Sequence, residues 1–377
     1  MALRGRIVQL SQDATHVSYR SIWPETSNAP PTPPASNPAS VSAEDEKDDT
    51  TELIEYYLNL GPNLSALYAQ WSAADSNFKK KAPKFTGIRI LRQHAWEALI
   101  GFICSSNNNI IRISQMVDKL CRHYGTYIGT LDGVDYYDFP NPEALTGDKV
   151  EAHFRELGFG YRAKFIVHTA RAVAAKQAGW LDSLRNPESP AFGQKPGQGD
   201  EWKVEGRDGY RAAHEELIQL MGVGAKVADC VSLMGLGWGE AVPVDTHVWQ
   251  IAVRDYRFGK GKHSSLTKQT YDAVGKRFRE LWGQEAGWAH SVLFTADLRA
   301  FSERLVKKEE EVVDEKEETK VKIEDGEAGE FVIKEEIKLN ARSKVKREAE
   351  DEKKPMLELD EVAVSSSERV KRRRRRK

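Results

Sequence analysis

The chain has 377 residues, of which 56 are Lys or Arg and 57 are Asp or Glu, giving a formal net charge of −1. This length predicts two or three domains, and the balanced charge excludes a protein that is cationic along its whole length. No run of 18 apolar residues suggests a membrane span, so we expect no membrane partner. Three widely spaced cysteines, Cys104, Cys121 and Cys230, predict no disulfide framework and no zinc or iron–sulfur site. We therefore expect a reducing compartment and neither a metal nor another cofactor.

Residues 1–23 predict a β-hairpin. Two stretches with β-branched residues alternate in polarity around a short polar loop at residues 11–14. Arg4 and Arg6 are also compatible with a transit peptide, which stays open as the alternative. The Pro- and Ser-rich, acidic segment at residues 24–49 predicts a linker between the hairpin and the rest of the chain.

Residues 303–377 predict a disordered tail. In this segment 44 of 75 residues are charged, so the segment has too little apolar surface to offset the entropy of ordering it. Basic residues concentrate at 344–377, and the final KRRRRRK is typical of a nuclear-import signal or a phosphate-binding tail. A solvated tail without a receptor is the alternative. We expect a nuclear protein with an import receptor as a partner, and we leave the mitochondrion open as a second destination.

Residues 50–302 predict a mainly α-helical body, because apolar residues recur there at helical spacing. No internal repeat, heptad or long exposed apolar stripe is present, so we expect a monomer. The predicted helices are His94–Cys104, Ile110–Gly125, Glu151–Leu157, Ala163–Gln177, Tyr210–Leu220, Ala225–Leu236, Thr246–Tyr256, Thr267–Trp282 and Gly287–Phe301.

The most informative segment is a helix–hairpin–helix at residues 211–236. Gly222 and Gly224 permit left-handed backbone angles, and they leave the amides at the start of the second helix open, where the helix dipole is positive. This pattern predicts a phosphate site that grips a DNA backbone without reading its sequence. A tight turn that serves only packing is the alternative.

Lys226 lies in the predicted first turn of the second helix, and Cys230 lies on the same face. A lysine that attacks a sugar carbon must be neutral, and both a helix N-terminus and an apolar wall destabilise an ammonium. These residues predict a nucleophilic amine. A lysine that only binds phosphate is the alternative.

About twenty residues later, Pro243 predicts an extended approach to a helix with Asp245 at its N-cap and His247 two places on. Asp245 is then a carboxylate held near Lys226, where it can stabilise an oxocarbenium-like sugar or shuttle a proton. An ordinary helix cap is the alternative.

Five separated motifs resemble, in the correct order, those of the 8-oxoguanine DNA glycosylase/AP lyase family, within the helix–hairpin–helix glycosylase superfamily. They are GFICSSNNNIIRI, VEAHFRELGFGYRAKF, GVGAKVADC, AVPVDTHVW and AGWAHSVLFTADL. The similarity covers about Leu58 to Phe301. It implies a helical fold of two subdomains with an N-terminal antiparallel β segment. It also implies an enzyme that excises 8-oxoguanine opposite cytosine from double-stranded DNA and cleaves 3′ to the abasic site by β-elimination.

The resemblance implies roles for residues at the sugar and at the phosphate. Lys226 would attack C1′ and form a Schiff base, and Asp245 would assist at the sugar. His247 would contact a phosphate, oriented by Asp297. Gly222 and Gly224 would supply the hairpin that binds the DNA backbone.

The resemblance also implies residues that handle the extruded base and the gap it leaves, because the base must leave the stack. Cys230 and Phe294 would sandwich the base. The residues that would enter the duplex are Asn107 and Tyr161, and those that would read the orphaned cytosine are Arg112 and Arg162. From spacing alone, the two arginines would be solvated surface residues, and Phe294 would be a core residue.

The sequence departs from the family pattern at three places. His290 stands where the family has a Gln that bonds the lesion, and Met221 stands where the family usually has Pro. The hairpin at residues 1–23 resembles only the later strands of the family's N-terminal sheet domain, without the glycine that senses the N7 hydrogen of 8-oxoguanine. We expect an incomplete gene model or a variant with weakened discrimination, so lyase chemistry is better supported than lesion specificity.

Two alternative functions stay open. The chain could be a non-catalytic or lyase-only helix–hairpin–helix DNA-binding protein. It could also be a glycosylase for another damaged base, although pyrimidine-specific relatives usually carry a four-cysteine cluster that is absent here.

Overall fold

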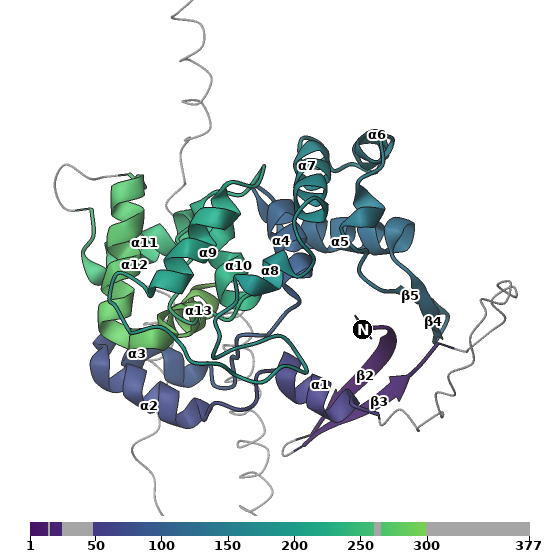
Figure 1. The fold of residues 1–377 in the computed structure, drawn as a ribbon. Coiled ribbons are helices and arrows are strands. Elements are labelled where there is room, and N and C mark those ends of the chain that lie inside the picture. The colour runs from purple at the N-terminus through teal and green to yellow at the C-terminus, as the bar shows by residue number, and fades with distance from the viewer. Residues whose placement is uncertain (14–15, 25–47, 260–264, 299–377) are drawn as a thin grey trace, which may run out of the picture. The chain divides into compact units, whose positions relative to one another are not determined.

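A computed structural model describes residues 1–13, 16–24, 48–259 and 265–298 (Figure 1). Within these ranges the structure is mainly α-helical, as the sequence predicts. Most of the predicted linker and all of the predicted charged tail lie outside the described residues. Among the helices that are described, none has both the length and the apolar character needed to cross a bilayer.

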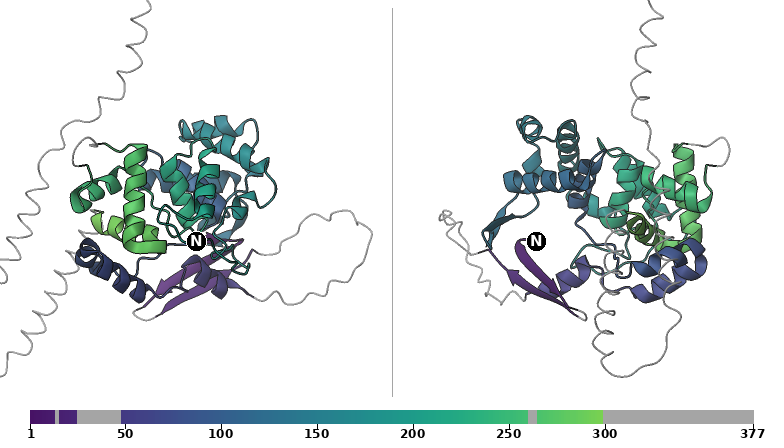
Figure 2. Two further views of the ribbon diagram at one scale, coloured as in Figure 1. Left: turned by 60° about the vertical axis from the view of Figure 1, so that its left-hand side comes forward. Right: turned by 180° about the vertical axis from the view of Figure 1, so that it is seen from behind.

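The predicted N-terminal hairpin is present as part of a three-stranded antiparallel sheet. Its strands are β1 (Ala2–Leu3), β2 (Arg6–Gln12) and β3 (Val17–Ile22), in that order across the sheet. The sheet is the purple part of the ribbon in Figure 2. Ser11 and Gln12, which were predicted to lie in the loop, are paired with residues of β3 instead. Both side chains are exposed, and the ladder depends on backbone groups that a polar side chain does not remove.

Three helices before His94 were not predicted from the sequence. They are α1 (Thr50–Tyr57), α2 (Leu64–Ala74) and α3 (Ser76–Lys81). The last is a short helix with Asp75 at its N-cap, whose carboxylate accepts hydrogen bonds from the amides of Asn77 and Phe78. Its six residues carry too few turns for a clear apolar period, and packing stabilises a helix of this length instead. Trp71 and Phe78 are their buried anchors.

A second antiparallel pair, β4 (Tyr127–Leu131) and β5 (Val134–Tyr137), was also missed. Asp132 and Gly133 connect the strands, with φ of +53° and +74°. An Asp-Gly turn with two positive φ angles is a strong local hairpin signal, so the sequence did contain the information.

The helices predicted from His94 onward are all present. They are α4 (Ala95–Ser105), α5 (Ile110–Tyr124), α6 (Val150–Glu156), α7 (Arg162–Ala174), α9 (Asp208–Ile218), α10 (Ala225–Met234), α11 (Thr246–Tyr256), α12 (Lys268–Trp282) and α13 (Ala286–Asp297). A further short helix, α8 (Trp180–Ser183), was not predicted. The last predicted helix ends at Asp297 rather than Phe301, and residues 299–301 are not described.

Helix α10 packs against both α4 and α9. Its residues from Val227 to Leu233 are all buried. This continuous burial explains why its sequence is apolar on more than one face. The first turn of α10 therefore leads into a closely packed helix. An aromatic cluster joins α2, α3 and α12: Phe78 lies 5.5 Å from Trp71 and 6.1 Å from Trp282 between ring centroids.

Candidate active site

The hairpin between α9 and α10 is formed by Gly222, Val223 and Gly224. Gly222 has a φ of +85°, and a Cβ added there would lie 2.6 Å from the Phe165 side chain. Backbone strain and the nearby ring both exclude a larger residue at this position. Gly224 is instead extended, with φ −99° and ψ 178°, and is the N-cap of α10. Of the two glycines that permit left-handed angles, Gly222 therefore adopts one and Gly224 does not.

Lys226 lies in the first turn of α10, as predicted, and its side chain is half-buried. Its Nζ lies 5.4 Å from the centroid of the Phe102 ring, which belongs to α4. The positive end of the helix disfavours an ammonium, whereas the aromatic face attracts one. A Cβ built on Gly224 would meet nothing within 4 Å, so the space in front of this turn is open.

Cys230 lies one turn after Lys226 and is 3% exposed. Burial raises the pKa of its thiol to about 12, and the Lys226 charge acts in the opposite direction. The thiol is therefore neutral at pH 7 and behaves as a small apolar group beside the amine.

Asp245 caps α11, as predicted, and accepts a hydrogen bond of 2.8 Å from the Val248 amide. The segment before it, Ala241–Val244, is buried. The charges of Asp245 and Lys226 both act on the pKa of His290, in opposite directions. Residues of three separate helices thus share one electrostatic environment: Lys226 and Cys230 of α10, Asp245 at the start of α11, and His290 of α13.

His290 and Phe294 lie one turn apart on α13, with ring centroids 6.3 Å apart. His290 is 5% exposed, and neither ring nitrogen has a well-formed hydrogen bond to a described residue. Burial lowers the pKa of His290 to about 4, so the ring is neutral at pH 7 and offers one donor and one acceptor. Phe294 is half-buried and contacts His247 edge-on at 5.2 Å.

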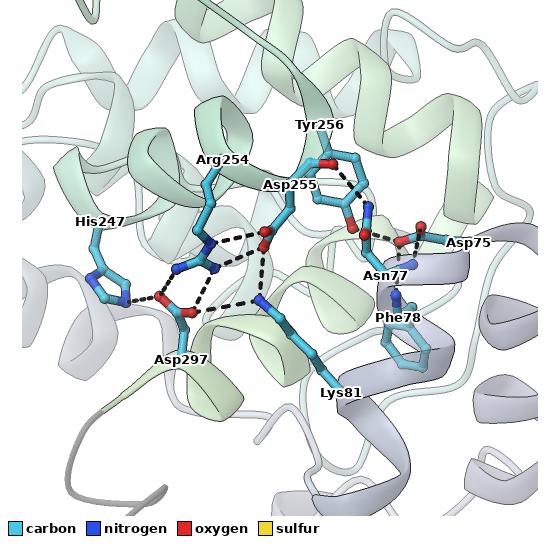
Figure 3. A network of polar contacts seen from close by, with 9 residues as sticks. All are labelled: Asp75, Asn77, Phe78, Lys81, His247, Arg254, Asp255, Tyr256 and Asp297. Atoms are coloured by element: carbon cyan, nitrogen blue, oxygen red, sulfur yellow. Dashed lines mark hydrogen bonds and ion pairs between the residues drawn. The ribbon is translucent and has the colours of Figure 1, made fainter. Parts of the chain in front are cut away.

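His247 pairs with Asp297, as the resemblance implied, with Nε2 3.2 Å from Oδ2 (Figure 3). Arg254 donates a hydrogen bond of 2.6 Å to the same carboxylate. Lys81 lies 3.7 Å from Asp297 and donates to Asp255 at 2.8 Å. Burial acts to raise the pKa of Asp255, but hydrogen bonds from Arg254 and Lys81 outweigh it and lower the pKa. This network joins α3, α11 and α13, and it includes His247, the predicted phosphate contact.

Two loops that carry the predicted duplex-reading residues are tied together. Asn107 is exposed and has a φ of +46°. Arg162 donates to the Asn107 carbonyl at 2.8 Å and also to the Ser106 carbonyl, and the Tyr161 hydroxyl donates to Ser106 at 3.1 Å. Arg162 is 3% exposed, so it is not the solvated residue that spacing alone allowed. To contact a cytosine, the guanidinium of Arg162 would have to break its hydrogen bonds to these carbonyls.

Arg112 follows the same loop at the start of α5. Its side chain is exposed and donates to the Gly158 carbonyl at 3.0 Å, which again links the two loops. Ile110 and Ile111, which precede it, are 73% and 74% exposed. The structure thus brings Asn107, Arg112, Tyr161 and Arg162 into one region, in which Arg162 is buried and the other three are exposed.

Sequence reasoning missed Phe102 and the network of Lys81, Arg254 and Asp255. Phe102 belongs to an apolar run that predicts a buried helix, and nothing local distinguishes it from core residues. The network joins residues more than 170 positions apart, which no periodicity reveals. Within the described residues, no group of three or more His, Cys, Asp or Glu side chains could hold a metal ion.

Two family models match the chain. The model of the HhH-GPD superfamily base excision DNA repair proteins matches residues 100–283, which include the hairpin, Lys226 and Asp245. The fold and the site thus define a member of this superfamily. The model of the 8-oxoguanine DNA glycosylase N-terminal domain matches residues 1–99, which include the three-stranded sheet. The chain belongs to the 8-oxoguanine DNA glycosylase family.

Two curated relatives are similar to about two thirds of this chain. The N-glycosylase/DNA lyase of Saccharomyces cerevisiae is 40% identical over 264 residues, which cover 66% of this chain and 66% of the relative. The N-glycosylase/DNA lyase OGG1 of Arabidopsis thaliana is 40% identical over 247 residues, or 65% of this chain and 61% of the relative. The chain thus spans just under two thirds of the length of these relatives.

A solved structure shares the fold. It is the 8-oxoguanine glycosylase/lyase of Clostridium acetobutylicum, in complex with double-stranded DNA containing cytosine opposite 8-oxoguanine. The two chains are 24% identical, with a TM-score of 0.57 over 76% of this chain and 80% of that one. The likeness shows the helix–hairpin–helix glycosylase fold.

The low pKa of His290 predicts a pH-dependent stability. Below its ordinary pKa of 6.5 the unfolded chain binds a proton on this ring, whereas the folded chain does not until about pH 4. Stability should therefore fall as the pH drops through this window. His290→Gln should reduce the loss of unfolding free energy between pH 7 and pH 4.5 by about 2 kcal/mol. Urea unfolding of the parent and of the variant at the two pH values measures this difference. An unchanged pH dependence of the unfolding free energy would contradict a buried, neutral His290 ring.

Proposed function

We propose that this protein is a bifunctional DNA N-glycosylase/AP lyase that excises oxidised purine, 8-oxoguanine opposite cytosine, from double-stranded DNA. The observation that carries the proposal is the position of Lys226. It lies at the start of a buried helix, beside an open glycine turn, with Cys230, Asp245 and His290 around it. Membership of the family and the two relatives described as N-glycosylase/DNA lyases support this assignment.

The proposed reaction has two stages at one sugar. The free amine of Lys226 attacks C1′, the bond from C1′ to the base breaks, and the base leaves with the electron pair and takes up a proton. Opening of the sugar gives a Schiff base between Lys226 and C1′. Removal of a C2′ proton then breaks the C3′–O bond and releases the strand on the 3′ side.

Asp245 stabilises the positive charge that develops at the sugar. Its backbone is fixed by the cap of α11, so the carboxylate needs no rearrangement when the charge appears. The carboxylate also attracts the ammonium of a nearby lysine, so its benefit lies in the transition state rather than in activating the amine.

The extruded base would lie between Cys230 and Phe294. The neutral thiol and the aromatic ring supply apolar contact, and His290 supplies one donor and one acceptor toward an edge of the base. A buried polar side chain without a well-formed hydrogen bond is costly, so a ligand that satisfies it gains affinity.

The duplex is held at two places. Backbone amides at the start of α10 and the side chain of His247 bind phosphates on the damaged strand. Asn107 and Tyr161 fill the gap, and Arg112 and Arg162 contact the cytosine. The complex of the Clostridium acetobutylicum enzyme contains this same base pair, which supports cytosine as the partner base.

Borohydride trapping tests the proposal. A Schiff base between Lys226 and DNA is reduced by borohydride to a stable covalent adduct, visible as a shifted band on a denaturing gel. We expect an adduct with duplexes that hold 8-oxoguanine opposite cytosine or an abasic site, and none with undamaged DNA. Lys226→Gln should abolish it, and Lys276→Gln, at an exposed lysine on α12, should not.

The outcomes separate the alternatives. An adduct on the abasic duplex alone would contradict lesion excision and leave a lyase. No adduct on any duplex would contradict enzymatic activity and favour a non-catalytic DNA-binding protein. An adduct on a duplex with another damaged base, but not with 8-oxoguanine, would reassign the substrate.

Asp245→Asn separates the charge of this residue from its capping role. Asn and Asp cap helices about equally well, so the unfolding free energy should change by less than about 1 kcal/mol. Without the carboxylate, the single-turnover rate on the 8-oxoguanine duplex should fall about 100-fold. Rapid-quench kinetics and urea unfolding of the same protein measure the two effects. An unchanged rate, or a rate that falls only in step with stability, would contradict the catalytic role.

A further inference from the structure

Asp229 is a buried carboxylate on α10 that has no part in the proposed reaction. It is 2% exposed and lies between Lys226 and Cys230 in the sequence. Its two oxygens are divided between two phenols: Tyr210 donates to Oδ1 at 2.6 Å, and Tyr271 donates to Oδ2. Burial raises the pKa of Asp229 and also raises the pKa of both phenols. Both tyrosines therefore remain protonated at pH 7 and can donate to the carboxyl group.

The two phenols come from different helices and differ in their other hydrogen bonds. Tyr210 belongs to α9, the first helix of the hairpin. Tyr271 belongs to α12, and its hydroxyl oxygen also accepts a hydrogen bond of 3.3 Å from the Val244 amide. Val244 is 1% exposed and immediately precedes Asp245. A chain of two hydrogen bonds therefore runs from the middle of α10 to the residue before the N-cap of α11.

This chain links the two residues that the proposed reaction brings to one sugar. Lys226 is carried by α10, one turn before Asp229. Asp245 is carried by the buried segment whose Val244 amide reaches Tyr271. A buried amide without an acceptor is energetically costly. Removal of the Tyr271 hydroxyl should therefore favour a shift of the segment that contains Val244. Hydrogen bonds in series also strengthen one another in a dry interior.

We propose that Tyr271 is a positioning residue that fixes Asp245 relative to Lys226 through the Val244 amide, with the buried carboxylate of Asp229 as its anchor. The proposal rests on the proposed function, because it concerns the geometry of that same site. A displacement of about 1 Å at a reacting group can slow a reaction about 100-fold, so a hydrogen bond outside the pocket can govern its rate.

The experiment compares Tyr271→Phe with Tyr210→Phe in the full chain. Each variant removes one phenol hydroxyl from the same carboxylate, and only Tyr271→Phe also removes the acceptor of the Val244 amide. The probe is a duplex with an abasic site, which leaves base recognition out of the measurement. For Tyr271→Phe we expect a single-turnover cleavage rate at least about 10-fold lower, with the dissociation constant for DNA within about twofold of the parent. For Tyr210→Phe we expect both values within about twofold of the parent.

Amide hydrogen exchange provides a second measurement that does not depend on activity. Exchange at Val244 should accelerate in Tyr271→Phe and not in Tyr210→Phe. Asp229→Asn is a further variant should Tyr271→Phe fail to fold. Because Asn keeps one acceptor oxygen, we expect a smaller but measurable loss of rate.

Three results would overturn the inference. They are a parental rate in Tyr271→Phe, equal losses of rate in the two tyrosine variants, and a parental rate in Asp229→Asn. Failure of the proposed function is distinguishable, because the parent itself would then form no adduct with the abasic duplex.

Discussion

The start of α10 is the point on which the site depends. Gly222 turns the chain with a left-handed φ against the Phe165 side chain, and no larger residue fits there. The turn places the positive end of a buried helix at an open surface and sets Lys226 in its first turn. One backbone feature thereby sets both the proposed phosphate site and the location of the amine, so the proposed function couples DNA binding to the chemical step.

Two of the side chains around Lys226, Cys230 and His290, are neutral at pH 7, whereas Asp245 supplies a carboxylate. Burial keeps the Cys230 thiol protonated and the His290 ring unprotonated at pH 7. In the proposed reaction such a site would recognise a base through shape and single hydrogen bonds. His290 would contribute one donor and one acceptor, so it would bond one edge group of a purine at a time. This limit would bear on which oxidised purines the proposed site accepts.

Much of the site could be predicted from the sequence because its key relations are local. Lys226 and Cys230 share a face through helical spacing, Asp245 caps a helix through its residue type, and His290 and Phe294 lie one turn apart. The relations that were missed span distant segments. The contact of Lys81 with Asp255 and that of Tyr271 with Val244 depend on how helices pack, and packing has no signature in local periodicity. The sequence leaves the conformation of Gly224 open, because glycine permits several backbone conformations and the sequence does not select one.

The central claim is that the amine of Lys226 forms the covalent bond to DNA. Proteolytic digestion of the borohydride-reduced adduct, followed by mass spectrometry of the peptides, identifies the residue that carries the sugar. The account predicts a single modified residue, Lys226, in the peptide that contains the glycine turn. Modification of another lysine or of the N-terminal amine, with Lys226 unmodified, would contradict it.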